Sequence, residues 1–233
     1  MDVILVPGLW LDGSSWQTVA SKLRAAGHVP HPLTLRGLTE RASDRTGLML
    51  ADHVAHIART IDQMGGAVAL VGHAEACGLV HAAVNRRPDR VARAFHVGGF
   101  PSADGTHVLS GFRADPHGAP AEPAEGEKQD DALAALRGRR RAAGLRGIDT
   151  PQHLTDERRF EVPATVVATQ FHSDDVRRWI DADIDPAREL RRIRDVTLVD
   201  LPSGRWPQIE QGEALAQLLL DALPLPQLPA ATA

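Results

Sequence analysis

The sequence predicts one α/β domain built on a mostly parallel six-stranded sheet with helices on both of its faces. Short β-branched runs alternate with longer segments of helical period, which is typical of such a sheet. The chain has 233 residues, 43% of them hydrophobic and 24% charged, and this suits a single soluble domain with a substantial core. The expected strands are Val3–Val6, Val29–Leu33, Ala67–Val71, Arg93–Val97, Ala164–Thr169 and Val196–Leu201.

Helices are expected between these strands. Residues 14–28, SSWQTVASKLRAAGH, begin with a serine cap and reach a glycine stop at Gly27. Residues 50–66, LADHVAHIARTIDQMGG, carry apolar residues at helical spacing. Residues 210–223, EQGEALAQLLLDAL, are expected to form the closing helix, and the proline-rich residues 224–233 a flexible tail.

One stretch breaks the alternation of strands and helices. Residues 102–160 contain no convincing strand and are dominated by Gly, Pro, Ala and charged residues. A structureless connection of that length is uncommon inside a compact domain. We therefore expect residues 1–101 and 161–223 to form the core, with residues 102–160 as a helical cap inserted over the carboxyl edge of the sheet. The segment DDALAALRGRRRAAGLRG is expected to be a cap helix, and its arginines form either a solvated face or a site for an anionic partner.

Composition restricts the partners and the compartment. The net charge of −4 gives no reason to expect a nucleic-acid partner. A single cysteine excludes an internal disulfide and suits a reducing compartment. The start, MDVILVPG, has no basic region before its apolar run, and no apolar run approaches the roughly 20 residues of a membrane span. We expect a cytoplasmic protein without a membrane partner or a cofactor.

Three segments of the sequence together resemble the α/β-hydrolase superfamily. VILVPGLWLDGSSW resembles its first strand and oxyanion loop, in the branch with PG in place of HG. ALVGHAEACGLVHAAVNRRPDRVARAFHVGGF looks like the nucleophile elbow, its helix and the next strand. VTLVDLPSGRWPQIEQGEALAQLL is similar to the last strand, the catalytic-histidine loop and the closing helix. The resemblance spans nearly the whole chain except the cap, and is greatest to small bacterial esterases related to methylesterases and hydroxynitrile lyases. A Rossmann oxidoreductase is disfavoured because no G-x-G-x-x-G follows the first strand.

The catalytic residues implied by this resemblance are missing. The serine of G-x-S-x-G occupies a strained turn between strand and helix, and the resemblance places Ala74 there. Arg205 stands where the family has its catalytic histidine, and a guanidinium cannot accept the proton. For the acid, the family positions are Gly98 or the stretch that contains Asp174 and Asp175. Ordinary serine hydrolysis is thereby excluded.

The backbone donors of such a site are still expected. The elbow turn would present the N–H of Glu75, and the loop PGLW would supply a second N–H from Leu9 or Trp10. Together these donors would form an oxyanion hole. A hole without a base suits an activated thioester that is attacked by an external nucleophile, rather than a plain ester attacked by water.

Several side chains near the elbow are candidates for a new role. Glu75 could pair with Arg205, act as a base or point to the surface. The residues expected to line a substrate pocket, with core packing as the alternative for the aromatic ones, are Trp10, Ala74, His96, Phe100, Ser102 and Trp206.

Other reactive residue types are expected to be structural. Cys77, about one helical turn past the elbow, is predicted to be a buried thiol rather than a nucleophile or acyl carrier. His73 is expected to be packed and hydrogen-bonded. His53 and His56 share a helix face but lack a third ligand, so no metal site is expected.

Three functions remain open at this point. The favoured one is acyl transfer in specialised biosynthesis, from an activated thioester to an external nucleophile, with Glu75, Leu9, Trp10 and Arg205 as the working groups. The thioester could be held by an acidic carrier protein that docks at Arg139 and Arg140. The alternatives are a lyase, cyclase or isomerase that transfers protons, and a non-catalytic pseudo-hydrolase that binds a ligand or a protein.

Overall fold

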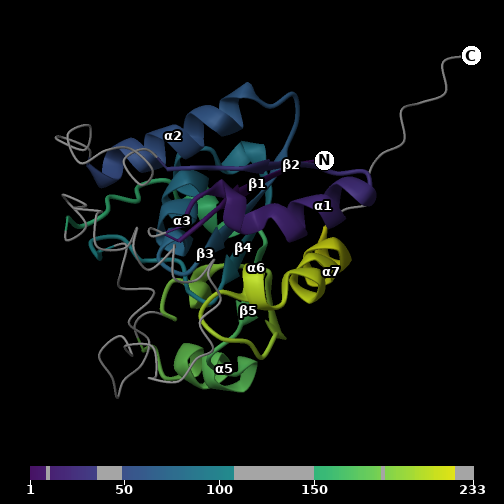
Figure 1. Cartoon of the computed structure of the whole chain (residues 1–233). Coiled ribbons are helices and arrows are strands. Elements are labelled where there is room, and N and C mark those ends of the chain that lie inside the picture. Colours follow the sequence, from purple (N-terminus) through teal and green to yellow (C-terminus); the bar gives the residue numbers. More distant parts are fainter. Residues whose placement is uncertain (9–10, 36–48, 108–149, 185–186, 224–233) are drawn as a thin grey trace, which may run out of the picture.

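A six-stranded parallel sheet forms the centre of the molecule (Figure 1). The computed structural model describes residues 1–8, 11–35, 49–107, 150–184 and 187–223. The strand order is β2-β1-β3-β4-β5-β6, and all five neighbouring pairs are parallel. The strands are β1 (Asp2–Val6), β2 (Val29–Pro32), β3 (Val68–His73), β4 (Val91–Val97), β5 (Ala164–Ala168) and β6 (Val196–Asp200). The predicted sheet is confirmed, although β3 continues two residues further than expected.

Helices cover both faces of the sheet, as predicted. Helices α1 (Gln17–Ala25) and α7 (Gly212–Ala222) pack together on one face, and α2 (Leu50–Gln63) and α3 (Ala76–Arg86) on the other (Figure 1). The described part also contains α5 (Ser173–Asp181), α6 (Pro207–Glu210) and the 3-10 turns η1 (Gly13–Trp16), η3 (Pro88–Arg90), η5 (Glu157–Glu161) and η6 (Leu190–Arg192). Within these residues, no helix has the length and apolar character needed to cross a membrane.

Alternate residues of the central strands build two separate cores. Ile4 and Leu70 pack with α2 and α3, whereas Leu5 and Val71 pack with α1 and α7. All four side chains are fully buried, and burial of such a side chain contributes about 1.5–3 kcal/mol. Because both faces of each strand are covered, these strands are apolar throughout and do not alternate with polar residues.

The order of the strands reverses next to β1. Strand β2 lies on one side of β1 and β3 on the other, so the loops that follow β1 and β3 diverge and leave a crevice at the carboxyl edge of the sheet. Val6 is in register with Gly72, which brings the loop at Gly8 next to the elbow at Ala74. This crevice is the expected place for a functional site.

The predicted cap falls mostly outside the described residues. Residues 108–149, which include the predicted cap helix with Arg139 and Arg140, are not described, and neither is the predicted tail. The two flanking segments are hydrogen-bonded to each other: Gly105 N–H donates to the Gln152 carbonyl and Gln152 N–H to the Thr106 carbonyl, both at 2.9 Å. The chain therefore leaves the described fold and returns to it at one place.

Candidate functional site

The turn after β3 has the backbone of a nucleophile elbow. Ala74 has a φ of 51°, in the left-handed region that a non-glycine residue rarely adopts. Its N–H donates to the Val97 carbonyl at 2.8 Å, and its own carbonyl accepts from the Cys77 N–H at 3.0 Å. These bonds hold both peptide groups of the turn, so the strained conformation is present although its side chain is only a methyl group.

Two glycines allow close contact around this elbow. A Cβ on Gly72 would lie 2.9 Å from the Ala76 carbonyl oxygen, and one on Gly99 would lie 2.6 Å from the Ala74 carbonyl oxygen. Side-chain carbons do not approach backbone oxygens that closely. The packing of β3, the elbow and the segment after β4 therefore requires glycine at both positions.

Glu75 and Arg205 meet beside the elbow. Glu75 is only 5% exposed, and its Oε1 lies 3.5 Å from Nη2 of Arg205, whose side chain is 18% exposed. A Cβ on Gly8 would lie 3.3 Å from Glu75 Oε2, so the carboxylate also lies against the loop after β1. Of the roles that the sequence left open for Glu75, the structure shows the pairing with Arg205. The carboxylate of this elbow residue thus lies beside Gly8, the last described residue before Leu9 and Trp10.

The loop that carries Arg205 is held from two sides. His73 Nε2 lies 2.9 Å from the Arg205 carbonyl oxygen, and Gln208 Nε2 lies 3.2 Å from His73 Nδ1. A neutral ring protonated on Nε2 satisfies both contacts, since it donates to the carbonyl and accepts from the amide. On the other side, the carboxylate of Glu210 accepts the backbone N–H groups of the residues before and after Arg205. The guanidinium is thus presented by a fixed backbone.

His73 serves this scaffold as a neutral ring. Burial lowers its pKa to about 4, and its ring meets that of Trp16 edge-on at 6.4 Å. At neutral pH it is therefore an uncharged, hydrogen-bonded histidine, which agrees with the structural role expected for it.

Solved structures similar to this chain cover almost its whole length. They include a pyrethroid hydrolase from Sphingobium faniae JZ-2 (TM-score 0.65, 18% identity, 95% of this chain and 96% of that one). Polyneuridine aldehyde esterase matches with a TM-score of 0.67 at 14% identity, over 94% and 98% of the two chains. The H243A variant of tomato methylketone synthase I, complexed with β-ketoheptanoate, matches with a TM-score of 0.64 at 14% identity, over 94% and 96%.

The chain has the α/β-hydrolase fold. No protein-family model and no curated protein sequence matches it. The predicted fold is thereby confirmed.

The positions considered for the acid of a hydrolase triad have other surroundings. Gly98 has a φ of +62°, and a Cβ there would lie 2.9 Å from Thr169 Oγ1. Asp174 is 79% exposed and pairs with Arg177 at 2.6 Å, while Asp175 caps the first turn of α5. Of these three positions, none gives the elbow a buried carboxylate partner.

His96 was expected to line the pocket, because it lies near the end of β4. The structure places it instead in the core: it is completely buried, and its ring lies 6.3 Å from that of His81 on α3. Burial lowers its pKa to about 3. The alternation of β4 explains the difference, because the neighbouring Phe95 and Val97 pack towards α1 and α7.

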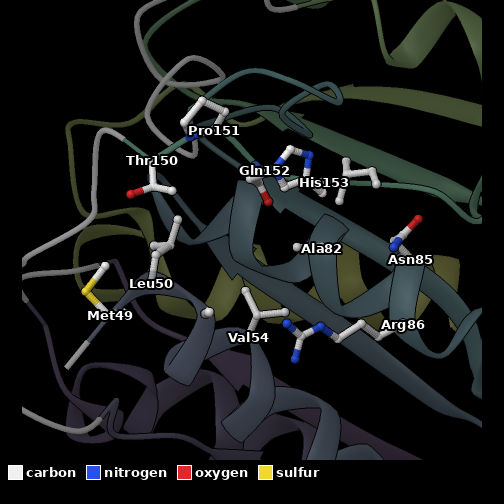
Figure 2. Close-up of a pocket in the computed structure, with 12 residues that line it drawn as sticks. Met49, Leu50, Val54, Ala82, Asn85, Arg86, Thr150, Pro151, Gln152 and His153 are labelled. Atoms are coloured by element: carbon white, nitrogen blue, oxygen red, sulfur yellow. The ribbon is translucent and has the colours of Figure 1, made fainter. Parts of the chain in front are cut away.

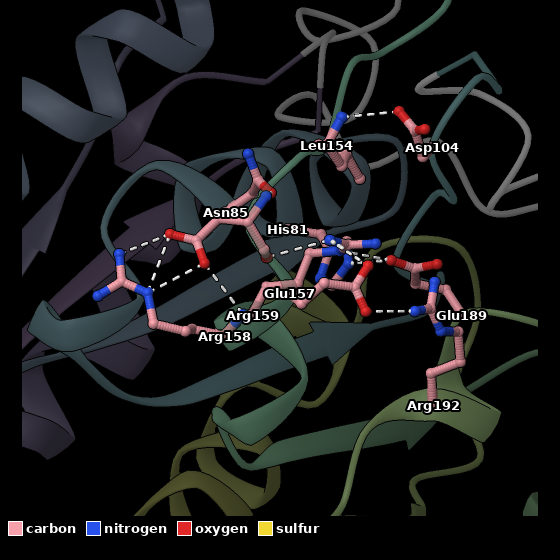
Figure 3. Close-up of polar contacts among 10 residues, drawn as sticks. His81, Asn85, Asp104, Leu154, Glu157, Arg158, Arg159, Glu189 and Arg192 are labelled. Atoms are coloured by element: carbon pink, nitrogen blue, oxygen red, sulfur yellow. Dashed lines mark hydrogen bonds and ion pairs between the residues drawn. The ribbon is translucent and has the colours of Figure 1, made fainter.

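Beside His96 lies a buried polar network that the sequence analysis did not predict (Figure 3). Glu189 Oε1 lies 2.9 Å from His81 Nε2 and accepts a hydrogen bond from Arg159 Nε, also at 2.9 Å. All three side chains are at most 3% exposed. Burial favours the neutral acid, but the hydrogen bonds from His81 and Arg159 outweigh it and lower the pKa of Glu189. The network fastens η5 and the start of η6 to α3.

Aromatic side chains gather at the carboxyl ends of β4 and β5. Phe100, 1% exposed, stacks on Phe171 at 5.0 Å between ring centroids and meets Trp179 edge-on at 5.9 Å. Phe100 follows Gly99, which touches the elbow, so this cluster lies beside the crevice. The sequence analysis named Phe100 but missed its two partners, although Phe171 follows β5 in the way that Phe100 follows β4.

The other predicted pocket residues differ in how much the structure shows of them. Leu9 and Trp10, the expected oxyanion donor and lining residue, lie outside the described part of the chain. Ser102 is 1% exposed, and Trp206 is half-buried next to Arg205. As substrate contacts, these residues remain predictions.

Cys77 and the histidines of α2 have the surroundings of structural residues. The thiol of Cys77 is buried 3.3 Å from the Gly72 carbonyl oxygen, and burial raises its pKa. His53 is 1% exposed. Within the described residues, no group of three or more His, Cys, Asp or Glu side chains could hold a metal ion.

Proposed function

We propose that this chain is a pseudo-hydrolase, which binds a small acyl compound in the elbow crevice and does not hydrolyse it. The observation that carries the proposal is the pair of Glu75 and Arg205 beside Ala74. A methyl group and a guanidinium stand where the fold usually has nucleophile and base. A carboxylate beside the elbow would also repel the negative oxygen that a tetrahedral intermediate develops, whereas hydrolases stabilise that oxygen with hydrogen-bond donors.

The same pair indicates the kind of ligand. Arg205 can donate to a carbonyl oxygen and Glu75 can accept from a hydroxyl or amide. An uncharged acyl compound, such as an ester, suits the pair better than an acid, because a second carboxylate would be repelled by Glu75. The aromatic cluster around Phe100 supports an apolar acyl or aryl body beside these polar groups.

The test is to measure binding and turnover on the same protein. We expect methyl phenylacetate to shift the indole N–H signals of Trp179 and Trp206 in an NMR titration, with no release of phenylacetate above the buffer rate. The variant Ala74→Ser/Arg205→His should gain slow ester hydrolysis if the crevice accepts the ester. Turnover by the native chain that is lost in Glu75→Gln would contradict the proposal.

The second candidate function is acyl transfer from an activated thioester. In this candidate, an acidic carrier protein that docks at Arg139 and Arg140 can hold the thioester. It is favoured by the conformation of Ala74, because a left-handed turn at a non-glycine residue costs about 1–3 kcal/mol and is retained without a nucleophile to present. Hexanoyl-N-acetylcysteamine with an amine acceptor is the direct assay. A donor consumed no faster than in buffer eliminates this candidate. The proton-transfer alternative is weakened, because His96 lies in the core with a pKa of about 3.

A further inference from the structure

A cavity lies between α2, α3 and residues 150–154 (Figure 2). Its volume of about 250 Å³ is below the roughly 300–1,000 Å³ of sites for drug-sized molecules, so it suits a smaller ligand. The cavity contacts the C-terminal half of α3, whereas the elbow lies just before the N-terminal end of this helix. Ala82, the first residue of α3 that lines the cavity, lies roughly 9 Å along the helix axis from Ala76, where α3 begins. None of the lining residues belongs to the elbow, so the two places are distinct.

The wall of this cavity is largely apolar. Leu50, Val54, Ala82 and Leu154 line it, and each is at most 8% exposed. All four belong to the core that α2 and α3 form with the sheet. The cavity thus continues the hydrophobic core outwards, and an apolar ligand body would extend that core.

Gln152 brings an unpartnered amide to this apolar wall. The residue is 6% exposed, and its backbone is fixed by the hydrogen bonds to Gly105 and Thr106. Neither its Nε2 nor its Oε1 has a hydrogen-bond partner among the described residues, and Figure 2 shows the amide oxygen directed towards Ala82. Buried amides are nearly always hydrogen-bonded. A polar group of a ligand would satisfy this one.

Arg86 supplies a positive charge on the other side. It lies in the last turn of α3 and is exposed. Its neighbour Arg87 pairs with Asp62, whereas Arg86 forms no ion pair with any described residue. In the view of Figure 2, its guanidinium extends towards Val54, and Ala82 lies between it and Gln152.

We propose that this cavity binds a small apolar carboxylic acid with a hydroxyl or keto oxygen at the end away from the carboxylate. The apolar body contacts Leu50, Val54 and Ala82. The carboxylate lies against the guanidinium of Arg86 at the mouth. The distant oxygen pairs with the amide of Gln152, which can both donate and accept.

The experiment uses three related probes on the full chain. 4-Hydroxyphenylacetate carries both polar groups, phenylacetate lacks the hydroxyl, and 4-methylphenol lacks the carboxylate. Titrations followed by NMR at low salt should give the highest affinity for 4-hydroxyphenylacetate, with a shift of the Gln152 side-chain amide signal. Gln152→Leu should weaken 4-hydroxyphenylacetate about fivefold to tenfold and leave phenylacetate unchanged. Arg86→Gln should weaken both acids about twofold to threefold and leave 4-methylphenol unchanged.

Matched variants control for general effects. Gln217→Leu on α7 and Arg24→Gln on α1 change the same residue types on the opposite face of the sheet, and should leave all three affinities as they are. Ala82→Leu fills the cavity and should abolish binding of every probe. Binding that survives Ala82→Leu, an equal loss of both acids in Gln152→Leu, or no binding of any probe overturns the proposal. If Gln152→Leu does not fold, two other measurements test the proposal. They are the loss of binding in Ala82→Leu and the difference in affinity between 4-hydroxyphenylacetate and phenylacetate for the native chain.

Discussion

At the scale of single residues, burial decides what Glu75 and Arg205 can do. The carboxylate is 5% exposed and the guanidinium side chain 18%. Loss of one member of such a pair leaves the other with an uncompensated charge in a poorly hydrated place, and this is more costly than removing both. The pair is therefore coupled in stability as well as placed together in the crevice.

A double-mutant cycle tests this coupling. We expect Arg205→Gln to lower the free energy of unfolding by about 1–3 kcal/mol, because buried Glu75 loses the opposite charge beside it. Glu75→Gln/Arg205→Gln should recover at least half of that loss in urea denaturation. The same cycle at Lys22 and Glu213, an ion pair whose side chains are 41% and 70% exposed, should give less than about 1 kcal/mol. Strictly additive effects at Glu75 and Arg205 would show that the contact does not stabilise the fold.

At the scale of elements, the elbow depends on backbone contact rather than on side-chain chemistry. β3, the elbow and α3 form one continuous segment, from Val68 to Arg86. Its approach to the residues after β4 is possible only because Gly99 has no side chain. The segment therefore tolerates the loss of a nucleophile and does not tolerate a methyl group at this glycine.

Gly99→Ala tests that contact. Its Cβ would lie 2.6 Å from the Ala74 carbonyl oxygen and 3.0 Å from Cys77 Sγ, so the elbow must shift, and we expect a loss of about 1–3 kcal/mol in thermal or urea unfolding. Gly65→Ala is the control, because nothing lies within 4 Å of its Cβ, and it should be neutral or stabilise by up to about 1 kcal/mol. Similar stability of the two variants would refute the close packing of the elbow.

Strands were predictable from sequence, whereas side-chain directions at the site were not. Strands such as β1 and β3 are buried on both faces, so their uninterrupted apolar runs identify them. The inward direction of Glu75 depends on the left-handed turn before it, and a sequence pattern does not contain that torsion. His96 was placed in the crevice by its position near a strand end, but the face of β4 on which it lies follows from the sheet register. Trp179 and Phe100 are far apart in sequence and meet only through the tertiary fold.

At the scale of the whole molecule, two buried neutral histidines link stability to pH. His73 and His96 have folded pKa values of about 4 and about 3, both lowered by burial. In the unfolded chain a histidine titrates near 6.5. Between these values the unfolded state binds more protons, so stability is fully present above pH 6.5 and is lost as the pH falls towards the folded pKa.

We expect each of these histidines to remove about 2 kcal/mol of stability between pH 7 and pH 5. The measurement is urea unfolding at half-unit steps of pH. His96→Leu should remove the contribution of that ring and make the profile less steep, and it breaks no hydrogen bond to a described residue. His107→Asn changes an exposed histidine and should leave the profile unchanged. A native profile that is flat from pH 7 to pH 5 would show that the rings are accessible to protons in the folded state.

The pair of backbone hydrogen bonds that joins Gly105 and Thr106 to Gln152 has a consequence for the length of the chain between them. The two hydrogen bonds fix the distance between Thr106 and Gln152, where the intervening chain starts and ends. Doubling the length of a flexible connection adds only about 0.6 kcal/mol to the free energy of closing it. A flexible connection of a different length between Thr106 and Gln152 should therefore be accommodated without a change in the register of the sheet.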